Sequence, residues 1–124
     1  MVGGIRSMFS RPGRLAAAWY EAAADEFVRI FNTPRGRIAF FSAARQIYLE
    51  EPHGDRGFWE RLPELRAPAL FVWGEKDRLV PAAFERHVVK AVPEARSVVM
   101  PDCGHVPQYE WPDETHRLIR EFLA

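Results

Sequence analysis

The stretch Ala69-Leu-Phe-Val-Trp-Gly74-Glu-Lys-Asp77-Arg-Leu-Val-Pro81 decides the fold class of this chain. Its first five residues are apolar, rich in aromatic and β-branched side chains, and bounded by a proline and a glycine. This pattern is typical of a strand that is buried on both faces. Asp77 follows three residues after the glycine, in a loop. Pro81 then suits the first position of a helix, because proline has no N–H group to leave unpaired there.

A second apolar run, residues 96–101, leads into the turn Asp102-Cys-Gly-His105, and an amphipathic helix is predicted after Pro112. Strand, helix, strand and helix in this order predict an α/β fold with two parallel strands and flanking helices. In such sheets, polar groups that carry chemistry collect at the carboxyl ends of the strands. Asp77 and His105 each follow one strand, so we expect the carboxylate and the imidazole to lie side by side. That geometry lets an aspartate orient a histidine and stabilise its protonated form.

The spacing of these residues resembles a known family. The pattern W-G-x-x-D-x-x-V-P followed by C-G-H-x-P-x-x-E-x-P-x-E, with the aspartate and the histidine 28 positions apart, is similar to the C-terminal half of an α/β-hydrolase. It is most similar to the branch of capped esterases, carbon–carbon-bond hydrolases and dehalogenases. The resemblance covers roughly residues 58–124 through these motifs and residues 11–50 only as a helical cap. It implies a partial α/β-hydrolase fold in which Asp77 is the triad acid and His105 the triad base.

The nucleophile of that family is not found in this chain. The hydrolase elbow places a serine, or an aspartate in dehalogenases and epoxide hydrolases, at the centre of G-x-S-x-G between a strand and a helix. None of the four serines is flanked by glycines two residues away on both sides; they are Ser7, Ser10, Ser42 and Ser97. The loop that forms the oxyanion hole is missing as well. An imidazole and its acid cannot perform acyl transfer without a nucleophile, so the isolated chain is predicted to be inactive.

Two functions therefore remain open. In the first, the chain is the C-terminal portion of a hydrolase that cleaves an ester or related bond through a Ser-His-Asp triad. A truncation, a split gene or a remnant would each explain the missing half, and the absent nucleophile is a serine or an aspartate. In the second, the chain is a non-catalytic remnant that acts as a binding or self-assembly module. A thiol nucleophile at Cys103 is a weaker alternative, because small residues are also what such a turn needs.

Other candidate site residues carry less information. Trp19, Tyr20 and Tyr48 are candidates for lining a substrate pocket from the cap side, although amphipathic packing at a helix interface is the favoured explanation for them. No pair among the four histidines has a metal-ligand spacing with carboxylate or cysteine support, so no metal site is predicted. The resemblance implies no cofactor.

The chain divides into two predicted regions. Residues 1–57 comprise a loop or ragged beginning at 1–13, helices at about 14–31 and 37–49, and a polar boundary at 50–57 that contains Pro52 and Gly54. Residues 58–124 are the βαβα portion. One edge of the first strand lacks a neighbour, and an apolar unpaired edge recruits another strand. We therefore expect a homodimer, formed through this edge or by exchange of helices, or a complex with the missing N-terminal half.

Composition excludes several kinds of partner. Seventeen basic and seventeen acidic residues cancel, and no cationic block stands out, which argues against nucleic acid and anionic membrane surfaces. No run approaches 18 apolar residues, and the first residues do not have the pattern of a signal peptide. A single cysteine excludes an intramolecular disulfide. A cytoplasmic protein that acts on a small molecule is the default expectation.

Overall fold

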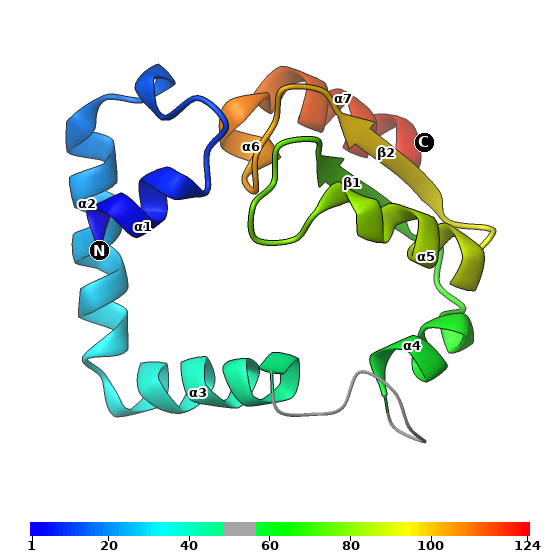
Figure 1. Ribbon diagram of the computed structural model, residues 1–124, viewed down its shortest axis with the longest axis horizontal. Coiled ribbons are helices and arrows are strands. Elements are labelled where there is room, and N and C mark those ends of the chain that lie inside the picture. The colour runs from blue at the N-terminus through cyan, green and yellow to red at the C-terminus, as the bar shows by residue number, and fades with distance from the viewer. Residues whose placement is uncertain (49–56) are drawn as a thin grey trace.

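Two short parallel strands form the centre of the structure (Figure 1). The structure is a computed structural model that describes residues 1–48 and 57–124. Side chains are described for residues 1–45 and 57–124. Strand β1 (Leu70–Gly74) pairs with β2 (Arg96–Met100) in parallel, from Leu70 opposite Arg96 to Gly74 opposite Met100. The parallel βαβ arrangement predicted from the sequence is confirmed. The helices are α1 (Val2–Ser7), α2 (Ala17–Phe31), α3 (Pro34–Tyr48), α4 (Phe58–Arg61), α5 (Glu85–Ala91), α6 (Pro107–Glu110) and α7 (Pro112–Leu123), with 3-10 turns at Pro12–Arg14, Leu62–Glu64 and Ala82–Phe84.

Alternation along β1 creates two apolar clusters, one on each face of the sheet. Phe71 and Trp73 pack against a cluster that includes Val88 of α5. Val72, with its neighbour Leu70, packs against a cluster that includes Leu118 of α7. Successive side chains of a strand point to opposite faces, so α5 and α7 cover opposite faces of the sheet (Figure 1).

The strand β1 is less buried than the sequence predicts. Leu70 to Trp73 are each only partly buried, whereas a strand covered on both faces was expected. Within the described residues the sheet contains only β1 and β2, so the other edge of β1 is unpaired. Ala69 O and Glu75 N bond to β2. In a parallel pair alternate residues bond to opposite sides, so the backbone groups of Val72 point to this open edge.

The first thirteen residues are ordered, and the expectation of a loop there is wrong. Helix α1 packs on α2, and the Arg6 guanidinium lies 5.1 Å from the centroid of the Tyr20 ring. Phe9, Trp19 and Tyr20 form a cluster of edge-to-face rings with centroids 5.2–5.6 Å apart. These contacts between residues about ten positions apart order the segment, although it has no apolar periodicity of its own.

Helices α2 and α3 form an arm that extends away from the sheet (Figure 1). Helix α3 begins at Pro34, three residues earlier than predicted, because Thr33 Oγ1 accepts a hydrogen bond from Gly36 N at 3.0 Å. The predicted end of this helix at Leu49 and most of the boundary at 50–57 lie outside the described residues. Four phenylalanine rings contact one another where the two helices meet, yet Phe40 and Phe41 remain 45% and 59% exposed.

Across the parts of the chain that the structure describes, no helix has both the length and the apolar character needed to cross a membrane.

Candidate functional site

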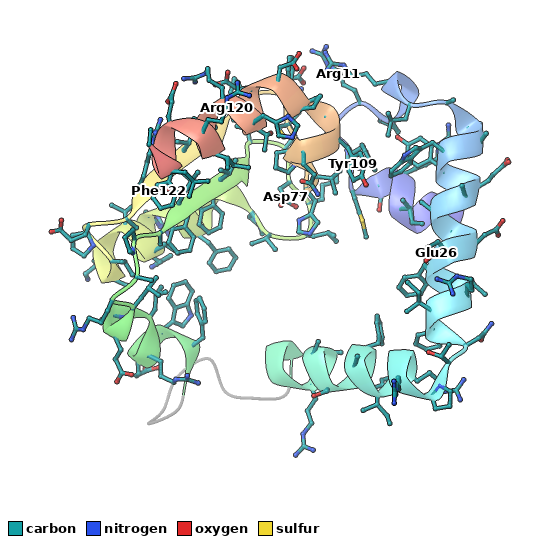
Figure 2. The ribbon with its side chains drawn as sticks, turned by 180° about the vertical axis from the view of Figure 1, so that it is seen from behind. Arg11, Glu26, Asp77, Tyr109, Arg120 and Phe122 are labelled. Carbon is teal, nitrogen blue, oxygen red and sulfur yellow. The ribbon has the colours of Figure 1, made fainter. Side chains whose placement is uncertain are left out.

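The loop after β1 and the turn after β2 bring Asp77 and His105 together. The imidazole Nδ1 lies 2.8 Å from Asp77 Oδ2. The two strands end in register, with Gly74 opposite Met100, so the segments that follow them start side by side. Figure 2 shows Asp77 in the loop beyond β1, close to the α6 helix that carries Tyr109. The juxtaposition expected from the sequence is therefore present.

The carboxylate of Asp77 is fixed at both oxygens. Oδ1 accepts hydrogen bonds from Leu79 N at 2.8 Å and Val80 N at 3.0 Å, and Oδ2 faces the imidazole. The side chain is only 7% exposed. Burial raises the pKa of Asp77, but the hydrogen bonds from the two backbone N–H groups and from His105 lower it by more. The net pKa of Asp77 therefore lies below its ordinary value. Asp77 is thus both a turn aspartate and the partner of the imidazole.

Glycine at position 74 is required by the close approach of the two segments. A Cβ added at Gly74 would lie 2.0 Å from Gly104 O and 2.6 Å from Cys103 O. Immediately after this contact, Glu75 N donates to Met100 O at 3.0 Å and Lys76 N donates to Cys103 O at 2.8 Å. Backbone contact at this point holds the Asp77 loop against the turn that leads to His105.

A small cavity opens beside the pair. It has a volume of about 230 Å³, and its lining includes Trp73, Val80 and Pro107 together with Asp77 and His105. The residues of β1 line it too, so it lies against the strand whose far edge is unpaired. The imidazole is about one third exposed, at 36%, which leaves its second nitrogen free of the aspartate and accessible. A reacting group at this cavity would meet an imidazole already oriented by a buried carboxylate.

The family assignment follows from comparison of the whole chain with known proteins. The model of the alpha/beta hydrolase family matches residues 2–118. This chain belongs to the alpha/beta hydrolase family. Over 64 residues, 52% of this chain and 22% of the relative, it is 42% identical to the 2-hydroxy-6-oxo-6-phenylhexa-2,4-dienoate hydrolase of Burkholderia cepacia. Over 66 residues, 53% of this chain and 23% of the relative, it is 38% identical to the 2-hydroxy-6-oxononadienedioate/2-hydroxy-6-oxononatrienedioate hydrolase 2 of Pseudomonas putida.

Solved structures cover more of the chain. Est816, described as an N-acyl homoserine lactone degrading enzyme, is 28% identical with a TM-score of 0.65 over 94% of this chain and 43% of its own. The serine hydrolase CarC, involved in carbazole degradation, has a TM-score of 0.73 at 18% identity, over 98% of this chain and 45% of its own, and supports the fold alone. The matches thus span less than a quarter of these curated relatives and less than half of these solved chains. The predicted partial α/β-hydrolase fold is confirmed.

No serine hydroxyl of this α/β-hydrolase chain contacts the His105 ring among the described hydrogen bonds. Ser7 Oγ donates to Gly4 O at 2.7 Å, and Ser97 Oγ accepts from the Trp73 indole at 3.0 Å. Ser42 is exposed on α3. Ser10 Oγ contacts Glu110 Oε2 at 2.6 Å. Among the described hydrogen bonds, none joins a serine to the His105 ring.

The thiol of Cys103 is unsuited to nucleophilic attack. The residue is fully buried, and its sulfur donates weakly to Gly104 O at 3.5 Å. Burial, together with the neighbouring carboxylates of Glu110, Asp77 and Asp102, raises the pKa of Cys103 to about 12. The thiolate is the reactive form of cysteine, so the geometry and the charge around this sulfur both oppose a catalytic role.

Trp19 and Tyr20 are not among the residues that line the cavity beside Asp77 and His105. Tyr20 is completely buried and its hydroxyl donates to Pro12 O at 3.0 Å, while burial raises its pKa. Trp19 packs against it and against Tyr109, with centroids 4.9 Å apart in the second contact. Tyr48 ends α3, and its side chain lies outside the described part of the structure. Packing explains the first two, and a role in binding substrate stays a prediction for all three.

Two residues that sequence reasoning left without a role meet at this site. Glu110 belongs to the C-G-H-x-P-x-x-E pattern, and Ser10 is one of the four serines that lie outside a G-x-S-x-G elbow. In the structure the Glu110 carboxylate is buried and accepts hydrogen bonds from Ser10 and Gly104. A glutamate five residues after a turn histidine was a usable signal for the first residue, whereas nothing local marked the second. Across the described residues no three His, Cys, Asp or Glu side chains come together as metal ligands.

Proposed function

We propose that this chain supplies the acid and the base of a hydrolase that uses a Ser-His-Asp type of triad. Asp77 is the acid and His105 the base. The observation that carries this proposal is the 2.8 Å contact between His105 Nδ1 and Asp77 Oδ2, made by a buried carboxylate whose other oxygen is held by backbone N–H groups. This arrangement holds the imidazole with Nδ1–H toward the aspartate and leaves Nε2 to take a proton.

The chemistry would proceed in two steps. A nucleophile hydroxyl attacks the carbonyl carbon of the substrate while its proton passes to His105 Nε2, and Asp77 stabilises the imidazolium that forms. The imidazolium then returns the proton to the leaving group, and a water molecule repeats the sequence to release the product. The substrate class that fits the relatives is a small molecule with an ester or a carbon–carbon bond next to a carbonyl.

The nucleophile in this proposal comes from residues outside these 124. The open edge of β1 supports that placement, because its unpaired backbone groups border the cavity at His105. A parallel strand added there would end beside the imidazole, at the carboxyl edge where the reacting groups of such sheets collect. These 124 residues alone are then inactive, and the nucleophile belongs to the N-terminal half of an α/β-hydrolase.

A serine-directed fluorophosphonate probe tests this function. The probe is applied to the chain alone, to the N-terminal half of the Burkholderia cepacia relative alone, and to the two expressed together. We expect labelling of the relative's half only in the co-expressed sample, and its loss when the chain carries H105A or D77N. Labelling that is the same with and without His105 would contradict the proposal.

A second candidate is a binding or self-assembly module. The open β1 edge and the exposed Phe40 and Phe41 rings favour it, because unpaired strand edges and apolar patches are sites of association. Light scattering at low concentration distinguishes this candidate, which requires a homodimer. A monomer of 14.3 kDa under those conditions would count against it.

A further inference from the structure

The turn that carries His105 is fastened to the beginning of the chain. His105 N donates to Met8 O at 2.7 Å. Ser10 Oγ lies 2.8 Å from Asp102 O, and Arg11 forms an ion pair with the Asp102 carboxylate. These contacts join residues 8–11, here named the N-terminal clip, to residues 102–105, here named the histidine turn. The two segments are more than 90 positions apart in the sequence.

The carboxylate of Glu110 lies between the clip and the turn. Oε2 accepts from Ser10 N at 2.8 Å and from Ser10 Oγ at 2.6 Å, while Oε1 accepts from Gly104 N at 2.7 Å. Glu110 is only 5% exposed. A buried carboxylate is tolerated only when hydrogen bonds replace its lost hydration, and here three donors from two distant segments do so.

Glycine at position 104 permits this arrangement. A Cβ there would lie 2.4 Å from Met8 O, 2.7 Å from Glu110 Oε1 and 2.7 Å from Ser10 N. The three atoms that crowd this position belong to the clip and to the glutamate. Because these groups approach so closely, the backbone immediately before His105 lies within reach of both the N-terminal clip and the Glu110 carboxylate.

Glu110 acts on the imidazole through the backbone. Its described hydrogen bonds go to Ser10 and Gly104, whereas the ring nitrogen Nδ1 of His105 is bound to Asp77. We propose that Glu110 is a positioning residue, which holds the histidine turn on the N-terminal clip and thereby keeps the imidazole at the aspartate. Its importance for turnover rests on the proposed role of His105 as the base, but the positioning is a property of this chain alone.

Nuclear magnetic resonance of the full chain, labelled with ¹⁵N, tests the positioning. The low-field resonance of the proton between His105 Nδ1 and Asp77 Oδ2 reports the contact, and D77N identifies it by removing it. Amide exchange of Gly104 and His105 reports the turn. We expect E110A to abolish or broaden the low-field resonance and to accelerate exchange of the two amides about five- to tenfold, the effect of one lost hydrogen bond. Amides of β2 keep their protection.

Two further variants and a matched control make the result specific. S10A removes one of the three donors to the carboxylate, so we expect a smaller change in the same signals. E110Q keeps an oxygen that accepts from Gly104 N, so it is expected to restore most of the amide protection. Glu114 is an exposed glutamate that pairs with Arg117 on α7, and E114A is expected to leave all of these signals unchanged.

The proposal is overturned by either of two results. One is a low-field resonance and amide exchange in E110A that match the wild type. The other is equal loss of protection throughout β1 and β2, which would assign Glu110 a general role in stability. If E110A does not fold, unchanged signals in folded S10A overturn the proposal as well. Failure of fluorophosphonate labelling with an intact resonance would refute the proposed function and leave the positioning in place.

Discussion

Replacing Gly74 with alanine tests the backbone contact on which the site is built. The new Cβ would lie 2.0 Å from Gly104 O, 2.6 Å from Cys103 O and 2.8 Å from the Gly104 carbonyl carbon. Non-bonded heavy atoms pack best at about 3.5–4.0 Å, so all three contacts are too short. Every one of them is with a backbone atom, which cannot rotate away as a flexible side chain would. The end of β1 must therefore separate from the histidine turn.

The expected loss of stability follows from what that separation breaks. The two residues that follow Gly74 donate backbone hydrogen bonds: Glu75 N to Met100 O at 3.0 Å and Lys76 N to Cys103 O at 2.8 Å. At about 1 kcal/mol each, together with the strain of overpacking, G74A should lower the free energy of unfolding by about 2–4 kcal/mol. A chain of this length has a total stability of only about 5–15 kcal/mol, so the change is large.

Urea unfolding followed by circular dichroism measures this difference. The matched control is G4A, because a Cβ at Gly4 meets nothing within 4 Å. Since Gly4 lies inside α1, alanine there should raise stability by about 0.5–1 kcal/mol through its better helix propensity. A G74A midpoint equal to that of the wild type, at an unchanged slope, would refute the contact between β1 and the histidine turn.

Three other predictions address the site and the core. The folded-state pKa of Asp77 lies below its ordinary value of 3.8, so the contribution of Asp77 to stability is complete above pH 3.8 and is lost as the pH falls through the lower folded pKa. D77N should remove this part of the pH dependence of the urea midpoint. A pH dependence that is the same in D77N and in the wild type would contradict the prediction. Cys103 should resist iodoacetamide in the folded chain and react in urea, as judged by mass spectrometry; equal rates would show that the thiol is accessible. L118A should cost about 2–5 kcal/mol, whereas L123A, at a side chain 74% exposed, should change the urea midpoint little; equal effects would refute the assigned face of α7.

The contact between Asp77 and His105 could be predicted from local sequence. Each of these residues follows an apolar run with strand character, and a parallel pair brings the carboxyl ends of its strands together. The structure also explains the glycines of the two motifs. At Gly74 and at Gly104 two backbone segments come too close together for a side chain to fit. The 2.8 Å contact between Asp77 and His105 is the outcome of these local rules.

Burial was predicted less well than secondary structure. The sequence of β1 indicates cover on both faces, but its side chains from Leu70 to Trp73 are only partly buried. The apolar residues of α3, which lie around most of its circumference, likewise predict partners on more than one side, and Phe41 is exposed. Apolar periodicity predicts which face of a helix or strand is buried, but it does not predict which residues pack against that face.

The sequence by itself determined the two parallel strands, their helices and the pairing of Asp77 with His105, because strand periodicity, turn residues and motif spacing act over short distances. Only the tertiary structure decided that residues 8–11 hold the histidine turn and that Glu110 joins them. The hydrogen bonds between Ser10 and Glu110 connect positions 100 residues apart. No local pattern encodes such a contact, since it exists only after the helices and strands between them have packed and the carboxylate has lost its water.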